Sequence, residues 1–239
     1  LISIDVPSGI CSDTGRSSKT GAASALYTLT VGLFKRGLIQ DFALPYVGRV
    51  VRFDIGIPDK SLLQLSKKVP LRICGKDLSF FSWPYISPSA SKYERGRVLI
   101  VAGSEKYKGA AYLAIKGALA SGAGSLQAVL PKSLANLIPN YAPEVVVAGV
   151  FENTSEQSVL IDKIFQEKFL DRIDSLLVGP GLGPSKESWD KTFSILEEFS
   201  GLLVLDADAL NRISKSNLGS KFFLERKSDT WITPHNKEF

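Results

Sequence analysis

Four short segments place glycine, carboxylate or imidazole groups directly after an apolar run. Gly103 and Ser104 follow Val98–Ala102, and three glycines, Gly181 among them, follow Ser175–Val178. Asp206 follows Leu202–Leu205, and His235, the single histidine, follows Thr230–Thr233. Glycines let a backbone approach a ligand closely, while carboxylate and imidazole groups bind polar ligands or exchange protons. The pattern predicts a ligand site assembled from several strand ends.

Each segment also has a purely structural interpretation. The small residues after Gly103 are compatible with tight helix–sheet packing, and the G-x-x-x-x-G-K-S/T order of a Walker A loop is absent. The glycines at 179–183 also fit a plain turn. Asp208 is better explained as the N-cap of a following helix than as a site residue, so Asp206 is the stronger candidate. Ligand contact is favoured for His235, because it follows a strand.

A separate group lies at the start of the chain, in Ile4-Asp5-Val6-Pro7-Ser8-Gly9. The Asp5 carboxylate is suited to proton exchange or to binding sugar hydroxyls, and Ser8 offers oxygen to a cation. The alternative is an Asx or proline turn.

The elements that must position these residues are predicted from apolar periodicity. Apolar runs predict strands at 1–6, 25–33, 47–55, 98–102, 126–130, 144–150, 175–178, 202–205 and 230–233. Helical patterns cover 109–121, 156–169, 186–199 and a start at 209–213. After Gly96, buried strands alternate with helices, which predicts a mostly parallel, doubly wound sheet with helices on both faces. Its ligands would bind at the carboxyl ends of the strands.

Composition limits the class of protein. The 239 residues are 44% hydrophobic and 22% charged, typical of a globular chain, which excludes a disordered or low-complexity protein. No apolar stretch is long enough for a membrane span. Two cysteines do not make a disulfide framework, and one histidine excludes a multi-histidine metal site. The basic excess in residues 60–116 indicates a solvated linker with its flanks rather than a nucleic-acid module. The absence of methionine suggests an internal fragment.

Seven motifs in order resemble the family of bifunctional NAD(P)H-hydrate repair enzymes. They are D-x-P-S-G, D-I-G-I-P, G-R-V-L-I-V-A-G-S, G-A-A-Y-L-A-x-x-G-A-L-x-x-G-A-G, V-G-P-G-L-G, L-D-A-D-A-L-N and T-P-H-x-x-E-F. The resemblance implies a partial Rossmann-like epimerase domain at residues 1–60, a linker and entry segment at 61–92, and an incomplete ribokinase-like doubly wound α/β domain at 93–239.

The resemblance also implies the reactions. The substrates are hydrated NADH and NADPH, whose R and S forms the epimerase interconverts. The dehydratase uses a phosphoryl group of ADP or ATP, with Mg²⁺, to restore the reduced nicotinamide; K⁺ accompanies the epimerase. A cytoplasmic homo-oligomer that binds neither nucleic acid nor membrane is expected.

Carried over by motif, Asp5 matches the catalytic epimerase aspartate and Ser8 a potassium ligand. Ala110, Gly181 and His235 match positions that line the hydrated-nicotinamide pocket, and Glu238 is a weaker Mg²⁺-linked candidate. Asp206 is the strand-end candidate for contact with the substrate or with Mg²⁺. The family's front half of the epimerase and its G-T-G-D segment, with the catalytic aspartate of the dehydratase, are absent from these residues. The fragment alone is therefore expected to be inactive.

Two alternatives remain open. One is another ribokinase-like enzyme, such as a small-molecule kinase of vitamin biosynthesis, although Asp5–Gly9 argues against it. The other is a non-catalytic short form that binds a dinucleotide. The choice between ADP and ATP and the oligomeric state are not settled by the sequence.

Overall fold

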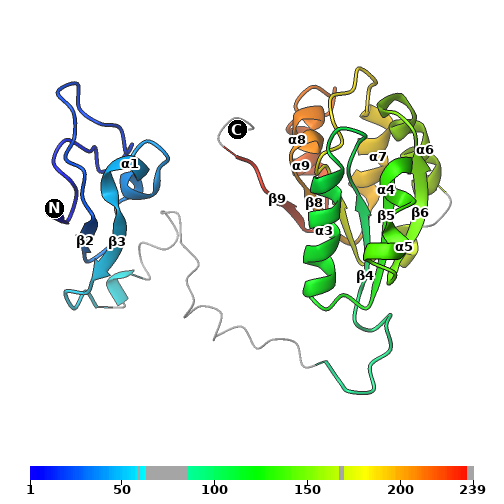
Figure 1. Ribbon diagram of the computed structural model, residues 1–239, viewed down its shortest axis with the longest axis horizontal. Coiled ribbons are helices and arrows are strands. Elements are labelled where there is room, and N and C mark those ends of the chain that lie inside the picture. The colour runs from blue at the N-terminus through cyan, green and yellow to red at the C-terminus, as the bar shows by residue number, and fades with distance from the viewer. Residues whose placement is uncertain (59, 63–85, 167–169, 236–239) are drawn as a thin grey trace. The chain divides into compact units, whose positions relative to one another are not determined.

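A computed structural model describes residues 1–58, 60–62, 86–166 and 170–235. The chain divides into two compact units, Leu1–Trp83 and Pro84–Phe239 (Figure 1). The division falls within the predicted linker at 61–92. Among the described residues, no helix is long and apolar enough to cross a membrane.

The first unit contains a parallel three-stranded sheet in the order β1-β2-β3. Its elements are β1 (Ile2–Ile4), β2 (Tyr27–Val31), the 3₁₀ helix η1 (Arg36–Ile39), α1 (Leu44–Val47) and β3 (Arg49–Phe53). All three strands lie within the predicted ranges, and each is shorter than predicted.

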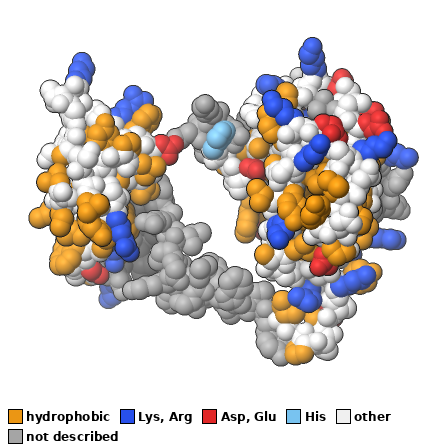
Figure 2. Space-filling model, in the orientation of Figure 1, with side chains coloured by type: hydrophobic (Ala, Val, Ile, Leu, Met, Phe, Trp, Pro, Cys, Tyr) orange, Lys and Arg blue, Asp and Glu red, His pale blue; other side chains and the backbone are white. Residues whose placement is uncertain are grey.

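The two faces of this sheet differ. One face buries Thr28 and Thr30, and the unit's small core is made by Ile10, Leu38, Ala43 and Val47. Side chains alternate across a strand, so Ile2 and Ile4 point to the opposite face. There they are 62% and 75% exposed, and hydrophobic side chains cover much of the visible surface of this unit (Figure 2). The apolar side chains of the first strand are therefore exposed, and Ser3 is its only buried residue.

The second unit is built on a six-stranded sheet in the order β6-β5-β4-β7-β8-β9, and every neighbouring pair is parallel. The strands are β4 (Arg97–Val101), β5 (Ser125–Pro131), β6 (Val145–Phe151), β7 (Ser175–Val178), β8 (Leu202–Leu205) and β9 (Thr230–Ile232). The helices are α3 (Lys108–Ala120), α4 (Lys132–Ala135), α5 (Ile138–Tyr141), α6 (Thr154–Gln166), η3 (Leu170–Arg172), α7 (Asp190–Glu198), α8 (Asp208–Ile213) and α9 (Lys221–Glu225).

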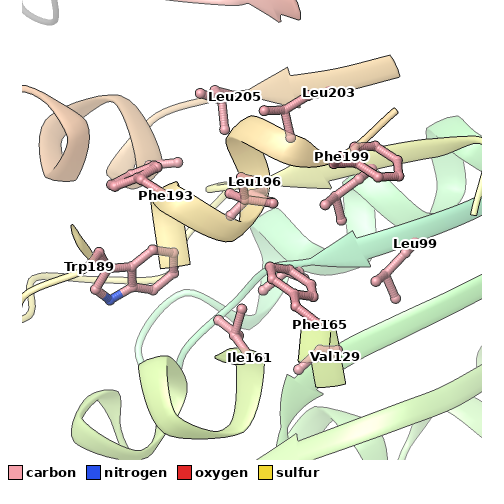
Figure 3. Packing of buried hydrophobic residues seen from close by; sticks show 14 of the residues in the cluster. Leu99, Val129, Ile161, Phe165, Trp189, Phe193, Leu196, Phe199, Leu203 and Leu205 are labelled. Carbon is pink, nitrogen blue, oxygen red and sulfur yellow. The ribbon is translucent and has the colours of Figure 1, made fainter. Parts of the chain in front are cut away.

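Helices cover both faces of this sheet, because its strands carry apolar side chains on both sides. Leu99 and Val101 of β4 belong to a core shared with α6, α7 and α8, which includes Phe193 (Figure 3). Ile100 belongs to a second core, shared with α3, α4 and α5. The predicted α/β class with a doubly wound parallel sheet is thus confirmed.

Candidate functional site

The carboxyl ends of β4 and β7 meet where the strand order reverses. From β4 the chain adds β5 and β6 on one side, then crosses to add β7, β8 and β9 on the other (Figure 1). The Gly103 amide, just past β4, donates a hydrogen bond to the carbonyl oxygen of Pro180, just past β7, at 2.8 Å. Doubly wound sheets bind ligands in the crevice at such a switch point.

Ala110 and Gly181 meet in this corner. A Cβ atom added to Gly181 would lie 2.8 Å from the Ala110 Cβ and 2.8 Å from the Tyr107 carbonyl oxygen, and Gly181 has a φ of +65°. Only glycine therefore fits without a shift of its neighbours. Both residues are half-buried, so a ligand can reach them. Two of the three predicted pocket-lining residues thus form one floor that is nearly free of side chains.

Asp206 connects the ends of three strands beside this floor. A Cβ atom on Gly179 would lie 1.7 Å from the Asp206 carbonyl oxygen, so the backbones after β7 and β8 touch there. Asp206 Oδ1 accepts a hydrogen bond from the Thr233 hydroxyl, just past β9, at 2.7 Å. Thr233 was not predicted as a site residue, although it lies in the same segment as His235.

Asp208 does not cap the helix that follows β8. It is the first residue of α8, and the capping position belongs to Ala207, which has a φ of +47°. This sharp turn brings the Asp208 carboxylate to the loop after β7, where Oδ2 accepts a hydrogen bond from the Gly183 amide at 2.7 Å. The N-cap interpretation of Asp208 was wrong.

A pocket of about 360 Å³ lies next to the floor. It is lined by residues that follow β4, β6 and β7 and by Gln157 of α6. Tyr107 and Gly183 belong to its wall, and Tyr107 also contacts Gly181. The pocket and the floor are therefore continuous through Tyr107. Neither Tyr107 nor Gln157 was predicted, because a tyrosine in a loop and a glutamine on a helix carry no distinctive sequence signal.

His235 is exposed, and its side chain is visible at the surface (Figure 2, pale blue). It follows Thr233, whose amide donates to the Leu205 carbonyl oxygen at 3.2 Å and so extends the pairing beyond β9. Thr233 therefore places the backbone leading to His235 beside Asp206. Glu238 lies outside the described residues.

Asp5 forms a second polar cluster in the first unit. It has a φ of +70° directly after β1, a conformation that non-glycine residues adopt rarely. Its Oδ1 accepts hydrogen bonds from the Val31 amide at 3.0 Å and from Lys35 Nζ. The hydrogen bond from Lys35, followed by that from the Val31 backbone, lowers the pKa of Asp5 below 3.8. Lys35 was missed, although it follows the second predicted strand at the same sheet edge.

Ser8 lies in a turn close to Asp5 in the chain. The Ile10 amide donates to the Pro7 carbonyl oxygen at 3.0 Å, and Gly9 has a φ of +89°, so the proline-turn interpretation of this segment describes its backbone. The Ser8 side chain is exposed. Within the described ranges, no group of three or more His, Cys, Asp or Glu residues could hold a metal ion.

The fold and the corner together define a class of protein. A parallel doubly wound sheet with a glycine-lined floor and an adjoining pocket at its switch point is typical of α/β enzymes that bind nucleotides or similar small molecules. The family model of NAD(P)H-hydrate dehydratase matches residues 98–239, which is more than half of the chain. The chain belongs to the NAD(P)H-hydrate dehydratase family.

Curated relatives of this chain include bifunctional repair enzymes. The chain is 36% identical to the bifunctional NAD(P)H-hydrate repair enzyme Nnr of Gloeobacter violaceus and 32% identical to that of a Synechocystis species. Each alignment covers 100% of this chain, but only 46% and 44% of the relative. The chain thus spans less than half the length of these curated relatives.

Solved structures of similar proteins are more distant. A ribokinase-like superfamily protein from Enterococcus faecalis superposes with a TM-score of 0.49 at 21% identity, covering 64% of this chain and 50% of that one. An ADP/ATP-dependent NAD(P)H-hydrate dehydratase from Bacillus subtilis, co-crystallised with ATP and Mg²⁺, superposes with a TM-score of 0.48 at 23% identity, covering 77% and 55%.

Proposed function

We propose that the full-length protein containing this chain repairs hydrated NADH and NADPH. It dehydrates the S form with ADP or ATP as phosphoryl donor, and it interconverts the R and S forms at a second site in the first unit. Family membership supports the dehydratase activity, and the similarity to bifunctional repair enzymes over the whole chain supports the epimerase activity.

The observation that carries the dehydratase proposal is the contact between Gly181 and Ala110. At this contact the floor is formed by backbone and a methyl group, so the face of a planar nicotinamide ring can lie against it. The adjoining pocket, of about 360 Å³, falls within the range of small-molecule sites and accommodates part of a dinucleotide. The half-buried Asp206 is positioned to accept hydrogen bonds from ligand hydroxyl groups.

The phosphoryl donor, when bound, supplies the group that converts the substrate hydroxyl into a leaving group. The described residues of this chain offer a substrate floor and pocket but no cluster suited to a divalent metal. Glu238, which the family resemblance links to Mg²⁺, lies outside those residues. No catalytic step through Mg²⁺ or nucleotide is assigned to this chain.

For the epimerase site, the low pKa of Asp5 keeps its carboxylate charged at neutral pH. Asp5 therefore acts there as a hydrogen-bond or proton acceptor rather than as an acid. The Ser8 hydroxyl is exposed and available as one oxygen ligand of K⁺. A cytoplasmic location and assembly into a homo-oligomer complete the proposal, and they rest on the family resemblance.

The test is an assay of the full-length protein with a mixture of R- and S-hydrated NADPH. Addition of ADP or ATP with Mg²⁺ should restore the absorbance of the reduced nicotinamide, and both epimers should be consumed. Phosphorylation of a pyrimidine or thiazole alcohol, with hydrated NADPH left unchanged, would show that the protein is instead a small-molecule kinase.

Two substitutions should separate the activities, because their sites lie in different units. His235→Ala should raise the KM for S-hydrated NADPH about tenfold, the size of loss expected for one ligand contact. Asp5→Asn should slow exchange of R and S but leave dehydration of the S form unchanged. Chiral separation of the two epimers during turnover measures both rates. Equal loss of both activities in either variant would contradict a division into two sites.

A further inference from the structure

Three side chains from outside the loop hold the backbone of residues 179–183. Asp208 accepts a hydrogen bond from the Gly183 amide at 2.7 Å. Gln157 Nε2 donates to the Leu182 carbonyl oxygen at 3.0 Å, and Arg212 Nη2 donates to the Gly183 carbonyl oxygen at 2.8 Å. The loop that presents Gly181 is thus tied to both α6 and α8.

Arg212 is the centre of this network. Its Nη2 also donates to Gln157 Oε1 at 3.0 Å, so it orients the amide that holds Leu182. Its guanidinium lies over the Trp189 ring, with 4.1 Å between the guanidinium carbon and the ring centroid. Arg212 is 9% exposed and Gln157 is fully buried. The network is therefore shielded from water on the protein side of the loop.

Burial of this cation is costly. Desolvation lowers the pKa of Arg212 to about 10, and the negative charge of Asp208 only partly opposes the shift. Arg212 Nε and Nη1 are buried with no hydrogen-bond acceptor among the described residues. Unpaired buried donors reduce stability, and an apolar side chain of similar size would avoid that cost. A role in fixing the geometry of the loop accounts for the arginine better than stability does.

We propose that Arg212, acting through Gln157 and together with Asp208, is a positioning residue for the substrate floor. It does not line the pocket or touch the ligand. It holds residues 181–183 in the conformation that keeps Gly181 against Ala110, and it thereby determines how tightly a planar ring binds there. The part of this inference that concerns the ligand rests on the proposed function, whereas the part that concerns loop order does not.

The test compares Arg212→Met and Arg212→Lys in the full-length protein, with Arg226→Met as the matched control. Arg226 is also a buried arginine of the same unit, but it donates to the carbonyl oxygens of Leu196, Phe199 and Gly201, away from the loop. Hydrogen–deuterium exchange of residues 179–183 reports loop order, thermal unfolding reports stability, and kinetics with S-hydrated NADPH separates KM from kcat.

Arg212→Met should speed exchange of the Leu182 and Gly183 amides and raise KM about tenfold to a hundredfold, as loss of a supporting residue does, with a smaller effect on kcat. Arg212→Lys, which keeps a positive charge and one donor nitrogen in place of the planar guanidinium, should restore part of both. Arg226→Met should lower the unfolding temperature and change neither loop exchange nor KM.

The proposal would be overturned if the loop amides of Arg212→Met exchanged at the wild-type rate and its KM equalled that of the wild type. If Arg212→Met does not fold, Gln157→Leu removes the bond to Leu182 and must give the same local increase in exchange, or the proposal fails. If the wild-type protein does not dehydrate hydrated NADPH, the proposed function fails, while the exchange comparison still decides whether Arg212 positions the loop.

Discussion

At the residue scale, the pairing of Asp5 with Lys35 determines the charge of the first site. Lys35 Nζ also donates to the Val31 carbonyl oxygen at 2.7 Å. The lysine is thus held by two acceptors, Asp5 just after β1 and Val31 at the end of β2. The same strand end supplies the Val31 amide to Asp5. The carboxylate is thus fixed in position and kept ionised by its neighbours, which suits it to accept hydrogen bonds from a ligand.

Lys35→Met should return the pKa of Asp5 toward 3.8, because the lysine hydrogen bond is the largest cause of the lowered value. NMR titration of the Asp5 carboxyl carbon measures this shift. A carboxyl group whose pKa is lowered on folding stabilises the protein at pH values above its ordinary pKa. That contribution is lost as the pH falls through the folded-state pKa. The substitution should therefore destabilise the protein at pH 7 and lose its effect as the pH falls through the lowered pKa of Asp5. An unchanged Asp5 titration would contradict the pairing.

At the element scale, the packing of the β7–α7 loop against α3 leaves no space for a side chain at Gly181. Gly181→Ala should lower the free energy of unfolding by about 1–2 kcal/mol, because alanine is strained in the left-handed backbone conformation of this position. It should also raise KM for hydrated NADPH, because the added methyl group would push the loop away from Ala110. Calorimetry and steady-state kinetics measure the two effects.

Gly117 provides the control, since it lies within α3 and a Cβ there would meet no atom within 4 Å. Gly117→Ala should increase stability by about 0.5–1 kcal/mol and leave KM unchanged. A Gly181→Ala protein with wild-type KM would show that the floor does not contact the substrate.

Much of the second unit follows from its sequence, for reasons that particular elements make clear. The strands β7 and β8 have the predicted bounds, because parallel strands covered on both faces are continuous apolar runs between polar turns. The helices α4 and α5 were not predicted, because each is a single turn of four residues and carries no period. The helix α7 begins at Asp190, four residues after its predicted start, since the preceding residues form the loop.

The site was predictable only in part. Strand ends and glycines marked Gly181 and Asp206, because they depend on local chain geometry, and the family motif marked Ala110. Lys35 and Arg212 act through residues that are distant in sequence, and a single sequence contains no record of such pairing. The role of Asp208 depends on the backbone turn at Ala207, and an alanine gives no indication of a positive φ.

At the scale of the whole molecule, each unit has its own hydrophobic core, so we expect separate unfolding. In the full-length protein, Phe193→Ala should lower the temperature of one calorimetric transition, because Phe193 is fully buried and packs on Phe222 with ring centroids 5.7 Å apart. Its cost should be about 3–5 kcal/mol. Leu38→Ala, in the small core of the first unit, should lower the temperature of a different transition. Its cost in unfolding free energy should be about 2–5 kcal/mol.

Val159→Ala serves as the control for these substitutions, because Val159 is 70% exposed on α6 and its truncation removes little buried surface. It should leave both transitions within about 0.5 kcal/mol of wild type. If Phe193→Ala and Leu38→Ala each shift every transition together, the two units unfold as one cooperative body.

The hydrogen bond between Gly103 and Pro180 also has a consequence for the order of events on the ribosome. Synthesis delivers β4, β5 and β6 first, and these strands can pair as soon as they emerge. The partner of Gly103 arrives only after α6 has been made, on the opposite side of β4. Since contacts distant in sequence form late, a nascent chain that has not yet reached Pro180 has a partial sheet but no floor. Translational pausing just before β7 would therefore delay ligand binding rather than the start of folding.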